Sequence, residues 1–119
     1  MKLVNNFLCG VQAASFAEAL SLIDRGGLDR DKALPILTGG APGSGIVKRV
    51  AERVAANDFT PIFGLRWMAK DLAYAIGTGS ARGIPLRTAA AALSIFEDAI
   101  AEGHGGEDFS AVAKSAPNT

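Results

Sequence analysis

Cysteine and histidine are almost missing from this sequence, which contains one of each among 119 residues. A single cysteine, Cys9, cannot form a disulfide bond within the chain. Cys9 and the lone His104 also provide none of the short repeated spacings that structural zinc sites use. We therefore expect neither a disulfide framework nor a metal centre.

Net charge is missing as well, because twelve basic and twelve acidic residues cancel. No cluster of basic residues interleaved with aromatic residues stands out, so nucleic acid is not an expected ligand. No apolar run approaches the roughly 20 residues that a membrane span requires. No charged-then-apolar leader opens the chain either. These absences predict a cytoplasmic protein without a membrane segment.

What the sequence does contain is helical periodicity along almost its whole length. The chain has the size of one domain, and its 49% hydrophobic content suffices for a modest core. Apolar residues recur at helical spacing between breaks rich in glycine and proline. The pattern predicts an all-α bundle of six helices, over residues 3–24, from 29 or 31 to 38, 44–56, 62–81, 85–103 and 108–114, with fraying over 115–119.

The glycine-rich stretch 39–45 precedes the third predicted helix. Backbone N–H groups at the start of a helix attract anions, so a stretch of this kind can bind phosphate. Here it lacks both a preceding strand and the Gly-Lys-Ser/Thr ending of a phosphate-binding loop. A connector is the favoured interpretation.

The predicted helix 62–81 has two occupied faces. One is the apolar stripe of a core helix, formed by Leu65, Met68, Leu72 and Ile76. The other mixes aromatic rings with two adjacent charges, at Phe63, Trp67, Lys70, Asp71 and Tyr74. Two interpretations remain open. Either Trp67 and Tyr74 pack on a neighbouring helix while the two charges face solvent, or this face is the wall of a cleft.

Lys2, Asn5 and Asn6 form a second polar group, at the start of the first predicted helix. Offsets of three and four place one ammonium and two carboxamides on the same side of that helix. A lysine held by neighbouring amides can serve as a general acid or base. The simpler interpretation is that these residues are only solvated.

Three blocks of sequence together resemble one known family. They are Lys2-x-x-Asn5-Asn6, the run Glu18-Ala19-Leu20 leading to Gly27-Leu28-Asp29, and Phe63 ahead of Met68-Ala69-Lys70-Asp71-Leu72. In this order and separation they look like the C-terminal helical domain of the β-hydroxyacid dehydrogenases. That family includes 3-hydroxyisobutyrate dehydrogenase, tartronate semialdehyde reductase, L-threonate dehydrogenase and, more distantly, 6-phosphogluconate dehydrogenase. The resemblance covers nearly the whole chain.

The resemblance implies catalytic roles for the first polar group. Lys2 matches the family's catalytic lysine, the general acid when an aldehyde is reduced and the base when a hydroxyl is oxidised. Asn6 matches an asparagine that binds substrate and holds this lysine. Asn5 lies at a position that lines the substrate cleft and is commonly asparagine in the 3-hydroxyisobutyrate branch.

The resemblance also implies a cofactor site on the predicted fourth helix. Lys70 matches a lysine that contacts the dinucleotide, and Phe63 and Asp71 match residues that line the same cleft. The implied reaction is the oxidation of a small 3-hydroxy acid, or the reduction of its semialdehyde, with NAD or NADP.

On this basis residues 1–119 are expected to be a single helical C-terminal domain for substrate binding and oligomerisation. The family's N-terminal NAD(P)-binding fold, with its strand and G-x-G-x-x-G turn, should precede Lys2, and the chain begins one residue before it. We therefore expect no tightly bound cofactor and no dehydrogenase turnover from this chain alone. Loss of the nucleotide-binding domain would uncover apolar surface, so a homo-oligomer, a dimer or higher, is also expected.

Two other functions remain open at this stage. The chain could be a free-standing helical interaction module that uses the same bundle only for association. It could also bind a small acid at Lys2 and Lys70 for regulation.

Overall fold

The computed structural model describes residues 1–114, and the fraying expected over 115–119 lies outside that range. The described residues contain seven helical elements and no strand. The elements are α1 (Lys2–Arg25), α2 (Arg30–Gly39), α3 (Gly45–Ala56), α4 (Leu65–Ala81), α5 (Arg87–Ala99), the π-helical turn η1 (Ile100–His104) and the 3-10 helix η2 (Phe109–Lys114). The predicted all-α fold is confirmed.

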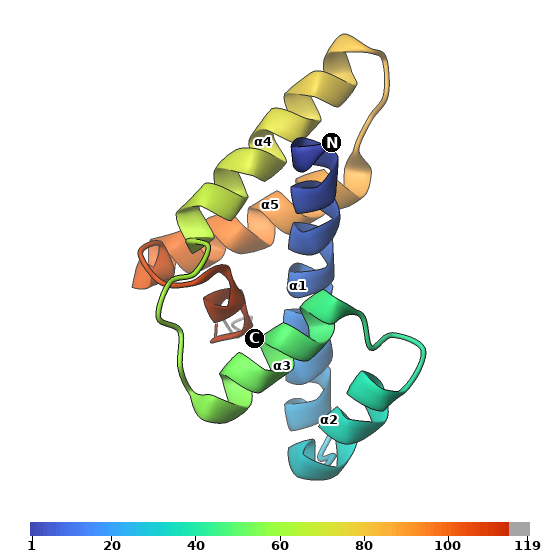
Figure 1. Cartoon of the computed structure of the whole chain (residues 1–119), viewed down its shortest axis with the longest axis vertical. Coiled ribbons are helices and arrows are strands. Elements are labelled where there is room, and N and C mark those ends of the chain that lie inside the picture. Colours follow the sequence, from blue (N-terminus) through green and yellow to red (C-terminus); the bar gives the residue numbers. More distant parts are fainter. Residues whose placement is uncertain (115–119) are drawn as a thin grey trace.

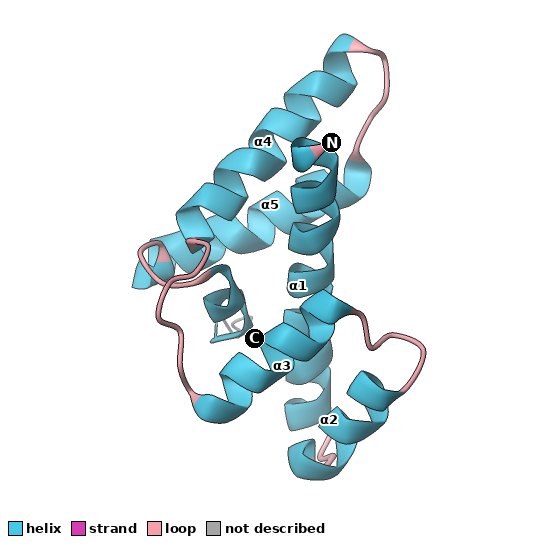
Figure 2. Ribbon diagram, viewed as in Figure 1, coloured by secondary structure: helices cyan, strands magenta, loops and turns pink. Residues whose placement is uncertain are grey.

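The first helix is the centre of the fold. α4 and α5 lie beside its N-terminal half, while α2 and α3 cross its C-terminal half (Figure 1). The 3-10 helix η2 contacts α1, α3, α4 and α5, so it packs between the two groups of helices. The helices form a branched assembly with long loops before α3 and α4, as the pink segments of Figure 2 show.

Small residues let neighbouring helices approach α1 closely. Its buried positions are Gly10, Ala13, Ala14, Phe16, Ala17, Leu20 and Ile23. The other helices place larger side chains against this surface, and the most fully buried of them are Val50, Leu65, Leu72, Phe96 and Val112. Burial of these apolar groups is the main source of the fold's stability.

Length and apolar composition alone would let α1 cross a membrane, contrary to the expectation that no segment is long and apolar enough. One helix of this kind is weak evidence for a span, because a central core helix has the same composition. The contacts of α1 with α2, α3, α4, α5 and η2 account for that composition here.

The 39–45 connector ends in a capped helix. The Ser44 hydroxyl oxygen accepts a hydrogen bond from the Val47 N–H at 3.1 Å, and the same hydroxyl donates to the side chain of Gln12 on α1. An N–H that a phosphate would need is therefore already bonded. This geometry agrees with a connector.

Two helix boundaries differ from the predicted ones. α4 begins at Leu65 instead of residue 62, because the N–H groups of Ile62 and Phe63 donate to the carboxylate of Asp108. α5 begins at Arg87, after Pro85, and passes into the π-helical turn at Ile100. Neither a long-range hydrogen bond nor a π-helical turn has a signal in the local apolar pattern.

Asp108 is the buried polar residue that orders this part of the chain. Its side chain is 1% exposed. One carboxylate oxygen accepts the N–H groups of Ile62 and Phe63 at 2.9 and 3.1 Å. The other accepts the N–H of Ser110 at 3.1 Å and also its hydroxyl. The short last helix predicted over 108–114 proves to be a 3-10 helix that begins after Asp108, at Phe109.

Burial raises the pKa of the Asp108 carboxyl, but the hydrogen bonds from Ser110, Ile62 and Phe63 outweigh it, so the pKa lies below its ordinary value. A folded-state pKa below the unfolded one means that the carboxylate stabilises the fold above the unfolded pKa of about 3.9. This contribution is lost as the pH falls through the folded pKa.

Asp108→Asn should lower the free energy of unfolding by about 1–3 kcal/mol near pH 7, because all of these contacts are donors and an amide replaces one acceptor with a donor. Urea unfolding at about pH 7 and about pH 3 measures this. The gap between wild type and variant should narrow in acid, since the wild type then loses its carboxylate. An equal gap at both pH values would contradict the role of the charge.

Candidate functional site

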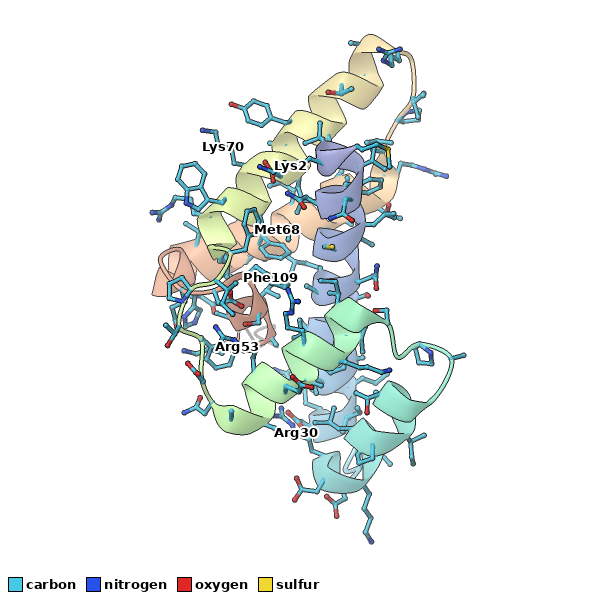
Figure 3. The ribbon with its side chains drawn as sticks, viewed as in Figure 1. Lys2, Arg30, Arg53, Met68, Lys70 and Phe109 are labelled. Atoms are coloured by element: carbon cyan, nitrogen blue, oxygen red, sulfur yellow. The ribbon has the colours of Figure 1, made fainter. Side chains whose placement is uncertain are left out.

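A single hydrogen bond joins the two polar groups that the sequence singled out. The carboxamide nitrogen of Asn6 on α1 donates to a carboxylate oxygen of Asp71 on α4 at 2.7 Å. Lys2 lies one helical turn before Asn6, and Lys70 directly precedes Asp71. Figure 3 shows Lys2 and Lys70 in the same half of the molecule, opposite the half that carries Arg30.

Two of the three polar residues at the start of α1, Asn5 and Asn6, form a short chain of hydrogen bonds. The side-chain nitrogen of Asn5 donates to the side-chain oxygen of Asn6 at 3.3 Å and also approaches the Cys9 sulfur at 3.9 Å. The nitrogen of Asn6 donates onward to Asp71. The carboxamide of Asn6 is thus fixed at both ends, while Lys2 and Asn5 remain exposed.

Close contact between α1 and α4 makes this bond possible. Gly10 lies one turn beyond Asn6, and a Cβ atom added there would stand 3.1 Å from both the Leu72 side chain and the Met68 sulfur. Both of these side chains are buried. Gly10 therefore sets the separation of the two helices next to the Asn6–Asp71 bond.

Lys70 lies between two aromatic rings. Its ammonium nitrogen is 5.1 Å from the centre of the Trp67 ring and 5.8 Å from the centre of the Tyr74 ring. The two aromatic residues are 58% and 57% exposed, so the interpretation that they pack on a neighbouring helix is wrong. Asp71, which was expected to face solvent in that interpretation, is half-buried against Asn6.

Phe63 lies in the loop before α4, and both its backbone N–H and its carbonyl oxygen are hydrogen-bonded. Its N–H donates to Asp108, and its carbonyl oxygen accepts the N–H of Phe109 at 2.8 Å. Its half-buried side chain lines a groove of 490 Å³, together with Pro61, Ile62, Gly64, Arg66, Trp67, Gly105 and Gly106. Phe63 therefore shares this groove with Trp67, whereas Lys70, Asp71 and Asn6 do not line it.

Sequence reasoning missed the second wall of this groove, the turn at Gly105 and Gly106. Charged residues next to this turn interact, because the Glu107 carboxylate lies 2.6 Å from the His104 ring nitrogen and 2.9 Å from the Lys114 ammonium. The hydrogen bond from Lys114 has the largest effect on the pKa of Glu107 and lowers it. Burial opposes this effect, and the hydrogen bond from His104 adds to the lowering, so the pKa lies below its ordinary value. The two adjacent glycines were the available signal.

Within residues 1–114, no three histidine, cysteine, aspartate or glutamate side chains gather closely enough to hold a metal ion. The groups that can act on a ligand here are cations, carboxamides and aromatic rings. Such groups bind anions, orient small polar molecules and stack on planar rings.

Residues 1–116 match the family model described as "NAD-binding of NADP-dependent 3-hydroxyisobutyrate dehydrogenase". The chain belongs to the β-hydroxyacid dehydrogenase family. L-threonate dehydrogenase of Cupriavidus necator is 36% identical over 98% of this chain and 39% of its own length. A 3-hydroxyisobutyrate dehydrogenase from Salmonella typhimurium has a similar structure, with a TM-score of 0.89 and 34% identity over 95% of this chain and 40% of that one. The Mycobacterium tuberculosis 3-hydroxyisobutyrate dehydrogenase, solved with L-serine, gives a TM-score of 0.84 at 29% identity, over 98% of this chain and 42% of that one.

Membership in the family leaves the position of this domain as a prediction. The chain spans about two fifths of the length of its curated relatives. The description of the family assigns NAD binding to the matched segment, whereas the sequence analysis placed the nucleotide-binding fold upstream of it. Residues 1–114 contain no strand, so whatever NAD contact this segment makes comes from helices and loops.

Asn6→Asp should lower the free energy of unfolding by about 1 kcal/mol or more near neutral pH, because it places a carboxylate against Asp71. The loss should shrink as the pH falls and one of the two carboxyls becomes protonated. Asn5→Asp is the matched control, since Asn5 is exposed and does not contact Asp71. Urea unfolding of the three proteins measures the difference, and equal stability of the two variants would contradict the Asn6–Asp71 contact.

Gly10→Leu should destabilise the fold by about 1–3 kcal/mol, since the added side chain must displace Leu72 and Met68. Gly77→Leu on the exposed side of α4 is the control. A side chain there meets nothing within 4 Å, and losing a mid-helix glycine should stabilise by up to about 1 kcal/mol. Thermal unfolding of both variants measures this, and a tolerated Gly10→Leu would show that α1 and α4 are not in close contact.

Proposed function

We propose that this chain is the helical C-terminal domain of an NAD(P)-dependent 3-hydroxy acid dehydrogenase, which supplies catalytic and cofactor-contacting side chains but does not turn over alone. The hydrogen bond between Asn6 and Asp71 carries this proposal. It links the turn that bears Lys2 to the turn that bears Lys70, so the implied proton-transfer group and the implied dinucleotide contact share one corner of the fold.

In this proposal Lys2 moves the proton and the cofactor supplies the hydride step. When a semialdehyde is reduced, the Lys2 ammonium donates a proton to the carbonyl oxygen as that oxygen becomes a hydroxyl. In the reverse direction the neutral amine takes the hydroxyl proton. Lys2 is exposed at the first residue of α1, which leaves its side chain accessible to a substrate.

Asn6 positions the substrate in this scheme. Because its carboxamide is bonded to Asn5 on one side and Asp71 on the other, its orientation is fixed before a ligand arrives. The family resemblance assigns Asn5, Phe63 and Asp71 to the same cleft. Asn5 and Asp71 are hydrogen-bonded to Asn6, while Phe63 lines the neighbouring groove. A fixed carboxamide lowers the entropic cost of holding the hydroxy acid next to the lysine.

The residues present fit an NAD or NADP molecule on the α4 side of this corner. Lys70 carries a positive charge held by two aromatic rings, and those rings are more than half exposed. A cation can bind phosphate, and exposed rings can stack on planar groups. The choice between NAD and NADP depends on residues that contact the adenosine ribose, which the family resemblance places in the nucleotide-binding fold.

We propose that the site needs a further domain because Lys2 and Lys70 are exposed to solvent. The chain spans 39% of the Cupriavidus necator relative, and the rest of that protein has no counterpart here. Lys2 and Lys70 lie on the surface of this chain, and only a second body could enclose a ligand between them. We propose that this body is the family's nucleotide-binding fold.

Association without catalysis is the alternative function, and one observation favours it. Met1, Val4 and Leu8 form an apolar stripe on the exposed side of α1, with 96%, 52% and 52% exposure. The same stripe would serve oligomerisation in the dehydrogenase. The two functions are therefore separated by the role of Lys2 and not by the oligomeric state. Cytoplasmic location stays a prediction in either case.

Turnover of a chimera tests the proposal. The chain would be fused behind the part of Cupriavidus necator L-threonate dehydrogenase that it does not cover, and assayed with NAD and NADP against L-threonate, 3-hydroxyisobutyrate and L-serine. We expect no turnover from the chain alone and measurable turnover from the chimera. Lys2→Met in the chimera should lower kcat by about 10²–10⁴-fold, because the proton-transfer group is gone.

Lys48→Met on α3 is the matched charge control, because Lys48 is exposed and lies on a different helix from both polar groups. It should leave kcat of the chimera unchanged. Turnover by the isolated chain would contradict the need for a second domain. A chimera whose kcat is the same with Lys2→Met would remove the catalytic role of Lys2 and favour association only.

A further inference from the structure

One wall of the groove beside Trp67 is a turn and not a helix. This wall is the pair Gly105 and Gly106, which lies between the π-helical turn η1 and the 3-10 helix η2. Gly103, two residues before it, has a φ of 99°, a backbone conformation that residues with a side chain rarely adopt. The chain therefore reverses here at three glycines, and the position of the turn depends on the contacts around it.

Backbone hydrogen bonds place this turn against α4. The N–H of Arg66 donates to the carbonyl oxygen of Gly105 at 3.2 Å, and the N–H of Leu65 donates to that of Glu107 at 2.8 Å. The Arg66 guanidinium also packs on the turn, since a Cβ added at Gly105 would lie 2.5 Å from it. The N–H groups of Leu65 and Arg66 therefore report whether the turn is closed on α4.

A side-chain contact across the turn includes a group that titrates near neutral pH. His104 and Glu107 flank the two glycines, and the Nδ1 atom of His104 lies 2.6 Å from the Oε1 atom of Glu107. The other carboxylate oxygen, Oε2, accepts a hydrogen bond from the Lys114 ammonium at 2.9 Å. Histidine is the side chain whose charge ordinarily changes between about pH 5 and pH 8, and His104 is the single histidine of the sequence.

The proton on His104 is the charge that varies at this turn. The pKa of Glu107 lies below its ordinary value, chiefly because of the hydrogen bond from Lys114, so Glu107 is a carboxylate throughout that pH range. The other charged groups around the turn are Arg66 on α4, Lys114 on η2 and Glu102 on η1. Arginine, lysine and glutamate ordinarily titrate outside this range. A protonated ring binds the Glu107 carboxylate more strongly than a neutral ring does.

We propose that His104 and Glu107 form a pH-sensitive latch on this wall of the groove. At the acidic end of the range the imidazolium binds the carboxylate and holds the turn on α4. As the pH rises, His104 loses its proton, the contact weakens and the turn opens more often. Opening moves Gly105 and Gly106 away from the groove, so the groove is wider on average at higher pH. The change is a shift in population between two positions of the turn.

Amide hydrogen exchange, followed by NMR on the 119-residue chain, tests this. Protection factors of Leu65 and Arg66, corrected for the intrinsic exchange rate at each pH, report opening of the turn. The amide of Leu72, in the buried middle of α4, reports global unfolding. From about pH 8 to about pH 5, protection of Leu65 and Arg66 relative to Leu72 should rise about two- to fivefold, the effect of one partly exposed ion pair.

Variants assign the rise to the proposed contact. His104→Gln is uncharged at every pH and should abolish it, whereas His104→Arg is a permanent cation and should keep protection high across the range. Glu107→Gln should also abolish the rise, because it removes the partner of the imidazolium. Glu97→Gln on the exposed side of α5 is the matched control and should retain it. Lys114→Met should retain it too, because Lys114 binds the other carboxylate oxygen.

A constant ratio of Leu65 and Arg66 protection to that of Leu72 across the range would overturn the proposal. An equal rise in His104→Gln would overturn it as well. Loss of the rise in Lys114→Met, with His104 intact, would contradict the assignment to the His104–Glu107 contact. All of these measurements follow backbone exchange in the chain alone, so their outcome does not depend on whether Lys2 is catalytic.

Discussion

The close approach of α1 and α4 is the constraint on which the rest of the site depends. Gly10 leaves no side chain where Leu72 and Met68 pack, and this lets the helices come near enough for Asn6 to reach Asp71. Apolar contact alone would tolerate a small slide of one helix along the other. The half-buried hydrogen bond does not, because sliding would leave a carboxylate without its donor. Packing thus sets the distance between the two polar turns, and the bond sets their register.

A second buried contact fixes the other end of α4. The carboxylate of Asp108 takes the N–H groups of Ile62 and Phe63, so the loop before α4 is held against the last described turn of the chain. Backbone bonds from Leu65 to Glu107 and from Arg66 to Gly105 extend the same contact. They also occupy the first N–H groups of α4, which removes the usual attraction of a helix start for anions. The groove beside Trp67 therefore offers cationic side chains and rings, and not a helix terminus.

The helical fold was predictable because its signal is local. Apolar spacing, Ser44 ahead of α3 and the glycines after α1 each act within a few residues of the element they define. The site was only half predictable for the opposite reason. Spacing put Lys2 and Asn6 on one side of a helix, and the family resemblance supplied their roles, but the partner of Asn6 lies 65 residues away. The start of α4 was misplaced because its determinant, Asp108, is equally remote. Exposure of Trp67 could not be predicted either, since an aromatic stripe has the same pattern on a covered face and an open one.

Charge explains why the open corner suits the ligands of a dehydrogenase although the chain as a whole is neutral. α1 carries no carboxylate before Glu18, and the one carboxylate of α4, Asp71, is engaged by a carboxamide. Around the start of α2, by contrast, the carboxylates of Asp24, Asp29 and Asp31 are matched by three cations, Arg25, Arg30 and Lys32. Arg30 also forms an ion pair with Asp24. The surface that carries Lys2, Arg66 and Lys70 therefore has an excess of positive charge, while the far end of α1 is balanced. This excess of positive charge supports the carboxylate substrate and the phosphate-bearing cofactor that we propose for the domain.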